Sequence, residues 1–337
     1  MNKLENQSLK SLNTFGFDVN AAQIFEVQEV SDMHKLYSMG LFNNPIRVIS
    51  GGSNLLLTQD IEIPVILIRN KGIIITQETN DHVFLKVGAG ENWHDFVIHC
   101  VERNWGGIEN LSLIPGCVGA CPIQNIGAYG TEVKDTITSV EVFNRATNEF
   151  ETFQNHECKF EYRDSIFKSQ RKDEYIITDV EFKLHKNWTP KTSYGDINQQ
   201  LAKQGISSPT IKDVSDAVTE IRKSKLPDPV EIGNSGSFFK NPIISKTLAD
   251  KLLQEYPALK LFPINEQEVK VAAAWLIDSL GWKGHTENDV GVHEKQALVL
   301  INKGNGSGKD ILHLARKIQD SVNVKFGIKL DFEVNIW

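Results

Sequence analysis

The chain has 337 residues, of which 40% are hydrophobic and 23% are charged, and its formal net charge at pH 7 is −7. These values are typical of a soluble globular protein with two or three domains. The acidic balance argues against nucleic-acid binding, because neutralising a phosphate backbone requires clustered Lys and Arg.

No segment has the length of a membrane span. The longest apolar runs, PVILI (64 to 68) and ALVLI (297 to 301), are strand-length and far below the roughly 20 residues that cross a bilayer. Residues 1 to 18 lack the charged and apolar regions of a secretory signal. We therefore expect a cytoplasmic protein.

The cysteines do not indicate a metal site. Cys117 and Cys121 lie in a Gly- and Pro-rich loop, and no second Cys or His pair at ligand spacing accompanies them. We expect small buried thiols at all four positions, which also include Cys100 and Cys158.

The first two thirds of the chain predict strands, tight turns and three helices. Short β-branched runs broken by Gly, Asn and Asp predict strands. Apolar residues at helical spacing predict helices. The expected helices are 31 to 39, 93 to 104 and one within 214 to 229 that its prolines end. The expected strands are IRVIS, VILIR, GIIITQ, HVFLKVG, SVEVFN (139 to 144) and YIITDVEFKL (175 to 184).

The last third predicts an α/β substructure. Its expected helices, with Gly or Pro at their ends, are 245 to 257, 265 to 281 and 307 to 327, and QALVLIN (296 to 302) is the strand between them. The tail KLDFEVNIW (329 to 337) alternates like a strand, and we expect it to pair with an earlier sheet.

Two familiar nucleotide-binding signals are absent. GNGSGKD (304 to 310) resembles a P-loop, but Lys303 and Asp310 stand where the motif needs Gly and Ser or Thr. No GxGxxG follows a strand, so a Rossmann domain has no support.

Two other glycine-rich stretches are more informative. VISGGSNLLLT (48 to 58) joins two apolar strands and offers consecutive backbone N–H groups, which suit a pyrophosphate. IPGCVGACPIQNIGAYG (114 to 130) combines glycines with the polar side chains of Gln124, Asn125 and Tyr129. Spacing alone leaves ligand binding and a simple linker as open alternatives.

The stretch GNSGSFFKNP (233 to 242) is, by its local chemistry, a loop that closes onto a strand, because Gly, Ser and Asn favour turns. On that interpretation Ser237 is an incidental turn residue.

Taken together, these motifs resemble one enzyme family along nearly the whole chain. SGGSN, IPGCVGACPIQNIGAYG, EYRDSIFK (161 to 168), YGDI (194 to 197), RKSKLPDP (222 to 229), GNSGSFFKNP, VHEKQALVLIN and the terminal FEV look like the UDP-N-acetylenolpyruvoylglucosamine reductase (MurB) family. The YGDI segment is similar to that of the longer of the family's two types.

The resemblance implies an α+β fold of the vanillyl-alcohol-oxidase or PCMH-like type. It implies FAD-binding subdomain 1 over 1 to 75, joined by a C-terminal strand at 328 to 337, FAD-binding subdomain 2 over 76 to 225, and a substrate-binding α/β domain over 226 to 327. Noncovalent FAD is the implied cofactor and NADPH the implied co-substrate. The implied reaction reduces the enolpyruvyl ether of UDP-N-acetylglucosamine enolpyruvate to UDP-N-acetylmuramate for peptidoglycan synthesis.

The resemblance also implies three catalytic roles. Hydride from reduced FAD reaches C3 of the enolpyruvyl group, and negative charge develops at C2 and the carboxylate, where fixed donors must meet it. Arg163 matches the position that contacts the carboxylate, and Glu333 would stabilise the enolic form if burial keeps it protonated. Ser237 matches the donor of the proton to C2. Without the family match, a salt-bridged Arg163 and a solvated edge Glu333 are the simpler interpretations.

The remaining site residues are carried over by motif. The implied FAD-binding residues are Gly51, Gly52, Ser53, Asn54, Gly116, Gly119, Ile126, Gly127 and Arg222. The implied substrate-binding residues are Tyr194, Lys225, Asn241 and Gln296. One position departs from the family, which commonly has arginine where this chain has Asn335.

Two competing functions stay open on the sequence. One is a flavin oxidase of the same fold that acts on an alcohol with O₂, and the other is a nucleotide-sugar binding protein with a decayed site. The expected partners are the sugar nucleotide and NADPH, with no nucleic acid or membrane, and a monomer is expected.

Overall fold

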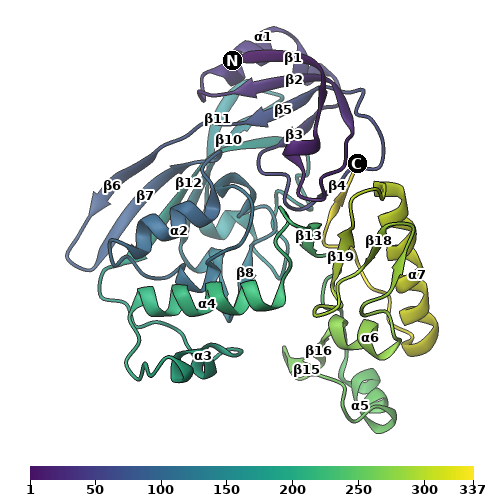
Figure 1. Cartoon of the computed structure of the whole chain (residues 1–337). Coiled ribbons are helices and arrows are strands. Elements are labelled where there is room, and N and C mark those ends of the chain that lie inside the picture. The colour runs from purple at the N-terminus through teal and green to yellow at the C-terminus, as the bar shows by residue number, and fades with distance from the viewer. The chain divides into compact units, whose positions relative to one another are not determined.

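Each of two structural units is assembled from three separate segments of the chain. The computed structural model describes residues 1 to 337 (Figure 1). Unit 1 comprises Met1–Gln7, Ala21–Gly51 and Ile61–Ser224, and unit 2 comprises Ser8–Asn20, Gly52–Asp60 and Lys225–Trp337. The division into two subdomains and a substrate domain stays a prediction.

Unit 1 contains a four-stranded sheet of order β1-β2-β5-β3. Its strands β2 and β3 both run parallel to β5, whose four residues are all buried. The strands are β1 (Asn2–Ser8), β2 (Asn20–Val27), β3 (Arg47–Ile49) and β5 (Val65–Ile68).

The second sheet of unit 1 is antiparallel, with the order β11-β10-β12-β7-β6. In β12, buried and partly exposed residues alternate because one face of the sheet packs into the core. The strands are β6 (Ile73–Glu78), β7 (His82–Gly88), β10 (Ile137–Asn144), β11 (Glu149–Gln154) and β12 (Tyr175–His185).

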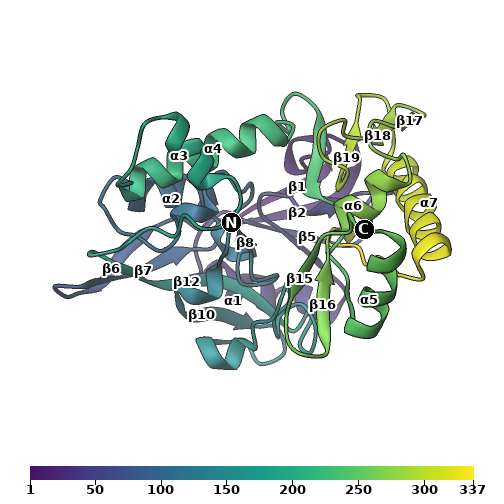
Figure 2. The same ribbon diagram turned by 90° about the horizontal axis from the view of Figure 1, so that it is seen from below.

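Helix α2 covers the buried face of this sheet (Figures 1 and 2). Asn92 caps its N-terminus by accepting a hydrogen bond from the N–H of Asp95. Its buried Trp93 and Phe96 reach β12, where the rings of Phe96 and Phe182 lie 4.9 Å apart. The helices of unit 1 are α1 (Asp32–Ser38), α2 (Trp93–Val101), α3 (Ile197–Lys203) and α4 (Ile211–Lys225).

Unit 2 is built around a four-stranded antiparallel sheet of order β13-β19-β18-β17, a smaller sheet of order β14-β16-β15, and a parallel pair of β20 with β4. The strands are β4 (Leu55–Leu56), β13 (Gly233–Ser237), β14 (Ile243–Ser245), β15 (Leu261–Pro263), β16 (Glu268–Val271), β17 (Thr286–Glu287), β18 (Val290–Val292), β19 (Val299–Asn302) and β20 (Asn335–Ile336).

Helix α7 packs beside β18 and β19 in both views (Figures 1 and 2). A capping box of Ser307 and Asp310 begins it, and Gly327 in a left-handed conformation ends it, as the glycine-rich sequence predicts. The helices of unit 2 are α5 (Lys246–Glu255), α6 (Ala273–Ser279) and α7 (Gly308–Phe326). None of the helices combines the length and the apolar character needed to cross a membrane.

Most predicted elements are confirmed, but two are wrong in part. The helix expected over 265 to 281 begins only at Ala273, because residues Glu268–Val271 form β16. The helix that the prolines were expected to end does end before them, at Lys225. Only residues Asn335–Ile336 of the expected tail strand pair as a ladder, and they pair with β4.

Candidate active site

In unit 1, the two glycine-rich stretches meet backbone to backbone. A Cβ atom placed on Gly51 would lie 2.9 Å from the Cα of Gly116, closer than side chains are found to pack. The loop is fixed beyond this contact, because Gly119 donates to the carbonyl of Ala89 and the buried Ile126 donates to that of Cys121. The stretches thus form one surface rather than two separate linkers.

Two residues of the second stretch, and Leu113 directly before it, adopt the left-handed region that favours glycine. Leu113, Asn125 and Tyr129 have φ values of 57°, 44° and 48°. Such strain persists where surrounding contacts hold it, and it gathers at functional sites. Asn125 shows how it is held here: its fully buried amide donates to the carbonyl of Glu161 at 2.9 Å and accepts from the N–H of Lys134 at 3.1 Å. The side chain of Asn125 therefore holds the loop to neighbouring segments of unit 1.

Arg163 lies against the glycine-rich loop. Its Nη2 donates to the carbonyl of Gly127 at 2.6 Å, and its guanidinium lies 5.3 Å from the ring centre of Tyr162. Its own φ is 55°. The guanidinium is thus fixed to the glycine-rich loop through Nη2.

Arg222, on α4, is a largely enclosed cation without an acidic partner. Its Nε donates to the carbonyl of Leu113 at 3.2 Å, and burial lowers the pKa of its guanidinium. Burial lowers the pKa of nearby His94; Asp95 opposes this shift, and Lys223 and Arg222 add to it.

The residues present fit the diphosphate of FAD. A guanidinium has five N–H donors, and an enclosed one without a carboxylate favours an anionic ligand. Glycine at position 51 lets the two loops meet through their backbones, where any side chain would clash with Gly116.

Tyr194, which lies shortly before α3, packs against the end of the glycine-rich loop 114 to 130. A Cβ atom on Gly130 would lie 3.1 Å from the Cβ of Tyr194, and half of the Tyr194 residue is exposed, at 50%. The ring is therefore available to a ligand.

In unit 2, Ser237 ends a strand rather than occupying the expected loop. Asn234 and Ser237 pair with Ile301 and Val299 of β19, and a bulge separates the two pairs. The buried amide of Asn234 fills the bulge by accepting from the N–H of Gly236 at 3.0 Å. This pairing, which the turn-rich composition conceals, fixes the backbone of Ser237 at the sheet edge.

Glu333 is held between the Ser237 strand and the SGGSN loop. Its N–H donates to the carbonyl of Phe238 at 2.9 Å, and its carbonyl accepts from Nδ2 of Asn54 at 3.1 Å. Asn335 completes the contact, because its N–H and its Nδ2 both donate to the carbonyl of Asn54, each at 3.1 Å. The structure therefore brings Glu333 close to Ser237 along the backbone and gives Asn54 a role in holding Glu333.

The other predicted residues of unit 2 are dispersed. Gly52 accepts from the N–H of Thr14, Asn241 accepts from the N–H of Ala273 at the start of α6, and Gln296 precedes β19. Ser53 precedes Asn54, and Lys225 is the last residue of α4. Arg163 belongs to unit 1, whereas Ser237 and Glu333 belong to unit 2, so the arrangement of the catalytic trio stays a prediction.

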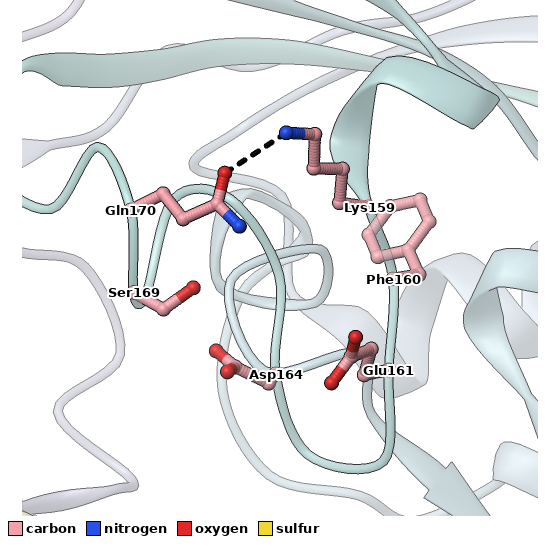
Figure 3. A pocket seen from close by; sticks show the side chains of 6 residues that line it. All are labelled: Lys159, Phe160, Glu161, Asp164, Ser169 and Gln170. Atoms are coloured by element: carbon pink, nitrogen blue, oxygen red, sulfur yellow. Dashed lines mark hydrogen bonds between the residues drawn. The ribbon is translucent and has the colours of Figure 1, made fainter.

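A small open cavity of about 280 Å³ is lined by residues from both sides of Arg163 in the chain, between Lys159 and Gln170 (Figure 3). Its polar lining includes Lys159, whose Nζ donates to Oε1 of Gln170 at 2.9 Å. The cavity is too small for FAD, and none of the predicted site residues lines it; the lining is Lys159, Phe160, Glu161, Asp164, Ser169 and Gln170.

Sequence reasoning missed three residues of unit 1 that organise the loop: Glu109, Asn110 and Trp188. Glu109 and Asn110 are each 1% exposed, and their partners lie 79 to 81 residues away in the chain. A buried Glu has no local sequence signal, so only the fold identifies it.

Two family models match the chain. Residues 21–153 match an FAD binding domain, and residues 228–337 match the C-terminal domain of UDP-N-acetylenolpyruvoylglucosamine reductase. The first match supports the fit of the glycine loops to FAD.

Curated relatives match over almost the full length. A protein of Flavobacterium johnsoniae called UDP-N-acetylenolpyruvoylglucosamine reductase is 51% identical, with 98% of each chain covered. A protein of Chromobacterium violaceum with the same name is 46% identical, with 96% of each chain covered.

Solved structures agree on the fold. The UDP-N-acetylenolpyruvylglucosamine reductase (MurB) of Thermus caldophilus has a TM-score of 0.67 at 23% identity, covering 100% of this chain and 98% of that one. The 6-hydroxy-D-nicotine oxidase of Arthrobacter nicotinovorans has a TM-score of 0.54 at 13% identity, covering 97% and 86%. The expected α+β fold of the vanillyl-alcohol-oxidase or PCMH-like type is confirmed. With relatives this similar over this length, the chain belongs to the family of UDP-N-acetylenolpyruvoylglucosamine reductases.

Proposed function

We propose that this protein is an FAD-dependent oxidoreductase that reduces the enolpyruvyl ether of UDP-N-acetylglucosamine enolpyruvate with NADPH, forming UDP-N-acetylmuramate for peptidoglycan. The observation that carries the proposal is the 51% identity over 98% of the chain to a protein named for this reaction. We expect a cytoplasmic monomer whose product serves cell-wall growth, cell shape and division.

The proposed cofactor site is divided between loops and one helix. Gly51, Gly52, Ser53, Asn54, Gly116, Gly119, Ile126, Gly127 and Arg222 would hold FAD. The close approach of Gly51 to Gly116 supports this, and so does the enclosed Arg222, which has no acidic partner. Bound FAD supplies the two-electron carrier that accepts hydride from NADPH and returns it to C3 of the substrate.

The chain's own residues would manage charge and proton. Arg163, fixed on one side by Gly127, would bind the substrate carboxylate and stabilise the charge that develops there. Glu333, held through its backbone by Phe238 and Asn54, would contribute a proton to the same carboxylate if it is neutral. Ser237 Oγ would donate the proton to C2, which needs only a short, oriented transfer because the developing carbanion is a strong base.

Substrate recognition would fall to Tyr194, Lys225, Asn241 and Gln296, with 226 to 327 as the substrate domain. Asn241 has its Oδ1 committed to the N–H of Ala273, so its side-chain NH₂ is the group left for a ligand. We assign Lys225 to the diphosphate because it is a point charge on a flexible stem.

The test compares the wild type with Ser237→Ala in two half-reactions. The wild type should show flavin absorbance and should oxidise NADPH only when the enolpyruvyl sugar nucleotide is present. Ser237→Ala should keep flavin reduction by NADPH but slow flavin reoxidation by the sugar nucleotide by about a thousandfold or more.

Each failure has its own meaning. A colourless protein that does not take up FAD refutes the flavin proposal, and NADPH oxidation that depends on O₂ and not on the sugar nucleotide supports an oxidase instead. Equal slowing of both half-reactions by Ser237→Ala shows a structural serine.

A further inference from the structure

The segment between β12 and α3, residues 186 to 196, carries Tyr194 and contains no helix or strand. Such a connection is usually mobile unless side chains secure it. Here it is secured to the rest of unit 1 at three points.

The first point is the indole of Trp188. Its Nε1 donates to Oε1 of Glu109 at 2.5 Å, and its ring stacks on His185 at 4.8 Å between centres. The ring rests on Gly106, where a Cβ atom would lie 2.3 Å from Cδ1 of Trp188. Only glycine at position 106 leaves room for this indole.

Glu109 is suited to be the fixed end of this contact. It is 1% exposed, its Oε2 accepts from the N–H of Gly107 at 2.6 Å, and no basic side chain pairs with it. A buried carboxylate in such a place depends on its N–H donors, and hydrogen bonds to charged groups are the strong ones. The indole of Trp188 is therefore one of two donors that Glu109 requires.

The second point joins the segment to the glycine-rich loop. The buried amide of Asn110 donates to the carbonyl of Lys191 at 2.9 Å and to the carbonyl of Tyr129 at 3.1 Å. The side chain of Asn110 thus links Lys191 of the segment to Tyr129 of the loop.

The third point is a packing contact between the segment and the glycine-rich loop. Tyr194 lies over Gly130, whose missing side chain leaves the space, and Gly195 faces the ring of Tyr129. Tyr194 remains half exposed, so it is placed beside the loop with its ring accessible.

We propose that Trp188 and Glu109 are positioning residues for the sugar nucleotide, because they fix the segment that presents Tyr194 at the flavin loop. The inference rests on the proposed function, in which Tyr194 contacts this substrate. Its consequence is selective: losing the anchor weakens use of the sugar nucleotide and leaves the reaction with NADPH unchanged.

The test is Trp188→Phe, which keeps an aromatic ring but removes the indole N–H. The KM for the enolpyruvyl sugar nucleotide should rise about tenfold, the size of one lost hydrogen bond to a charged group. The rate of flavin reduction by NADPH should stay within about twofold of the wild type. Independently of activity, amide hydrogen exchange across 186 to 196 should become faster.

Trp282→Phe is the matched control. It removes an indole N–H of similar setting in unit 2, where Nε1 of Trp282 donates to Oγ of Ser321 at 2.8 Å. It should change neither the KM nor exchange in 186 to 196. If Trp188→Phe folds poorly, Glu109→Gln is the second variant. Its one amide oxygen cannot accept from both the indole of Trp188 and the N–H of Gly107, so the KM and the exchange in 186 to 196 should again both rise.

Faster exchange with an unchanged KM would overturn the positioning role, and unchanged exchange would show that Trp188 is no anchor. An equal loss in both half-reactions would indicate general damage to unit 1. If the wild type itself fails to use the sugar nucleotide, the proposed function fails, whereas the exchange result still tests the anchor.

Discussion

Arg163 pairs a strained backbone with a fixed side chain. A non-glycine residue at φ 55° costs about 1–2 kcal/mol, and the bridge between Glu161 and Asp164 closes the turn around it. The strained turn places the guanidinium against the glycine-rich loop, where it donates a hydrogen bond to the carbonyl of Gly127. A lysine could not take both the bond to Gly127 and a bidentate carboxylate.

On β12, the fold destabilises the charged form of the Asp179 carboxyl group. Burial raises the pKa of this carboxyl from 3.8 to about 6, and Glu141, its cross-strand partner, adds like-charge repulsion that the ion pair between Lys86 and Glu141 offsets in part. Between these two pH values the unfolded chain has lost the proton that the folded chain keeps. Stability therefore falls as pH rises through this window.

We predict that Asp179→Asn stabilises the protein at pH 7.5 by about 1–2 kcal/mol, which is less than the free-energy equivalent of the pKa difference because solvent screens this partly exposed group. The gain should disappear below about pH 4, where the carboxyl is protonated in both states. Urea denaturation of both proteins at pH 4 and pH 7.5 measures it.

Asp213→Asn provides the opposite sign. Hydrogen bonds from Thr210 lower the pKa of Asp213, so its charge stabilises the fold above its unfolded pKa, and its loss should destabilise at pH 7.5. A destabilised Asp179→Asn at neutral pH would mean that its carboxylate has a cationic partner strong enough to outweigh burial.

At this scale the sequence predicted residue types but not pairings. The GGSN motif identified Asn54, yet its contact with Glu333 joins residues 279 apart in the chain. Trp188 and Glu109 belong to no sequence motif. Their hydrogen bond joins residues 79 apart in the chain and forms only in the folded protein. Local patterns cannot report such contacts.

Strand β13 illustrates how an element depends on a missing side chain. A Cβ atom on Gly233 would lie 2.2 Å from the carbonyl oxygen of Phe15, which also accepts from Nδ2 of Asn302 at 3.0 Å. Beside it, the N–H of Asn234 donates to the carbonyl of Thr14 at 3.0 Å. The strand that ends in Ser237 thus lies directly on the segment 14 to 15.

We predict that Gly233→Ala costs more than about 3 kcal/mol of folding stability, since backbone rather than a flexible side chain blocks the methyl group. Gly281→Ala is the control, because its left-handed φ of 77° costs only about 1 kcal/mol and nothing lies within 4 Å of the new methyl. Urea denaturation gives both values. Equal, small losses would show that β13 can move away from Phe15.

The prediction of one helix over 265 to 281 was wrong for a physical reason. Val269 and Val271 are buried at a spacing of two, as a strand requires, while Leu276 and Ile277 continue the same apolar run into α6. Read as one window, the run also fits helical spacing. Pairing of β16 with β14 and β15 decides between them, and partners in neighbouring strands are not visible in a local window.

At the scale of the whole molecule, unit 2 is discontinuous, so its core depends on residues from distant parts of the chain. Its core packs Phe15, Phe17 and Leu56, which come from the first 60 residues, against Leu314 and Ile318 of α7. The family model for the C-terminal domain covers only 228–337 and so omits these residues.

We predict that a fragment of residues 225 to 337 does not fold by itself, because it lacks part of its core and the partner of β20. Circular dichroism on heating should show no cooperative transition, whereas the full chain should show one. A sharp transition for the fragment would mean that the three segments of unit 2 are not interdependent.

The fold class and most elements followed from the sequence because the motifs of the resemblance run through the chain in order, and because α7, β5 and β12 each carry a regular apolar period. The three-segment composition of each unit did not follow. Segments 8 to 20 and 52 to 60 have no compositional boundary that marks them as part of unit 2.

The contact between Asn54 and Asn335 spans 281 positions of the chain. As a ribosome makes the protein from its N-terminus, β4 emerges long before β20 exists, and unit 1 can complete its core first. Glu333 can be bound by the SGGSN loop only after residues 333 to 335 have been synthesised and have left the ribosome. Until then, translation order would keep the proposed catalytic centre unassembled, although most of its residues already exist.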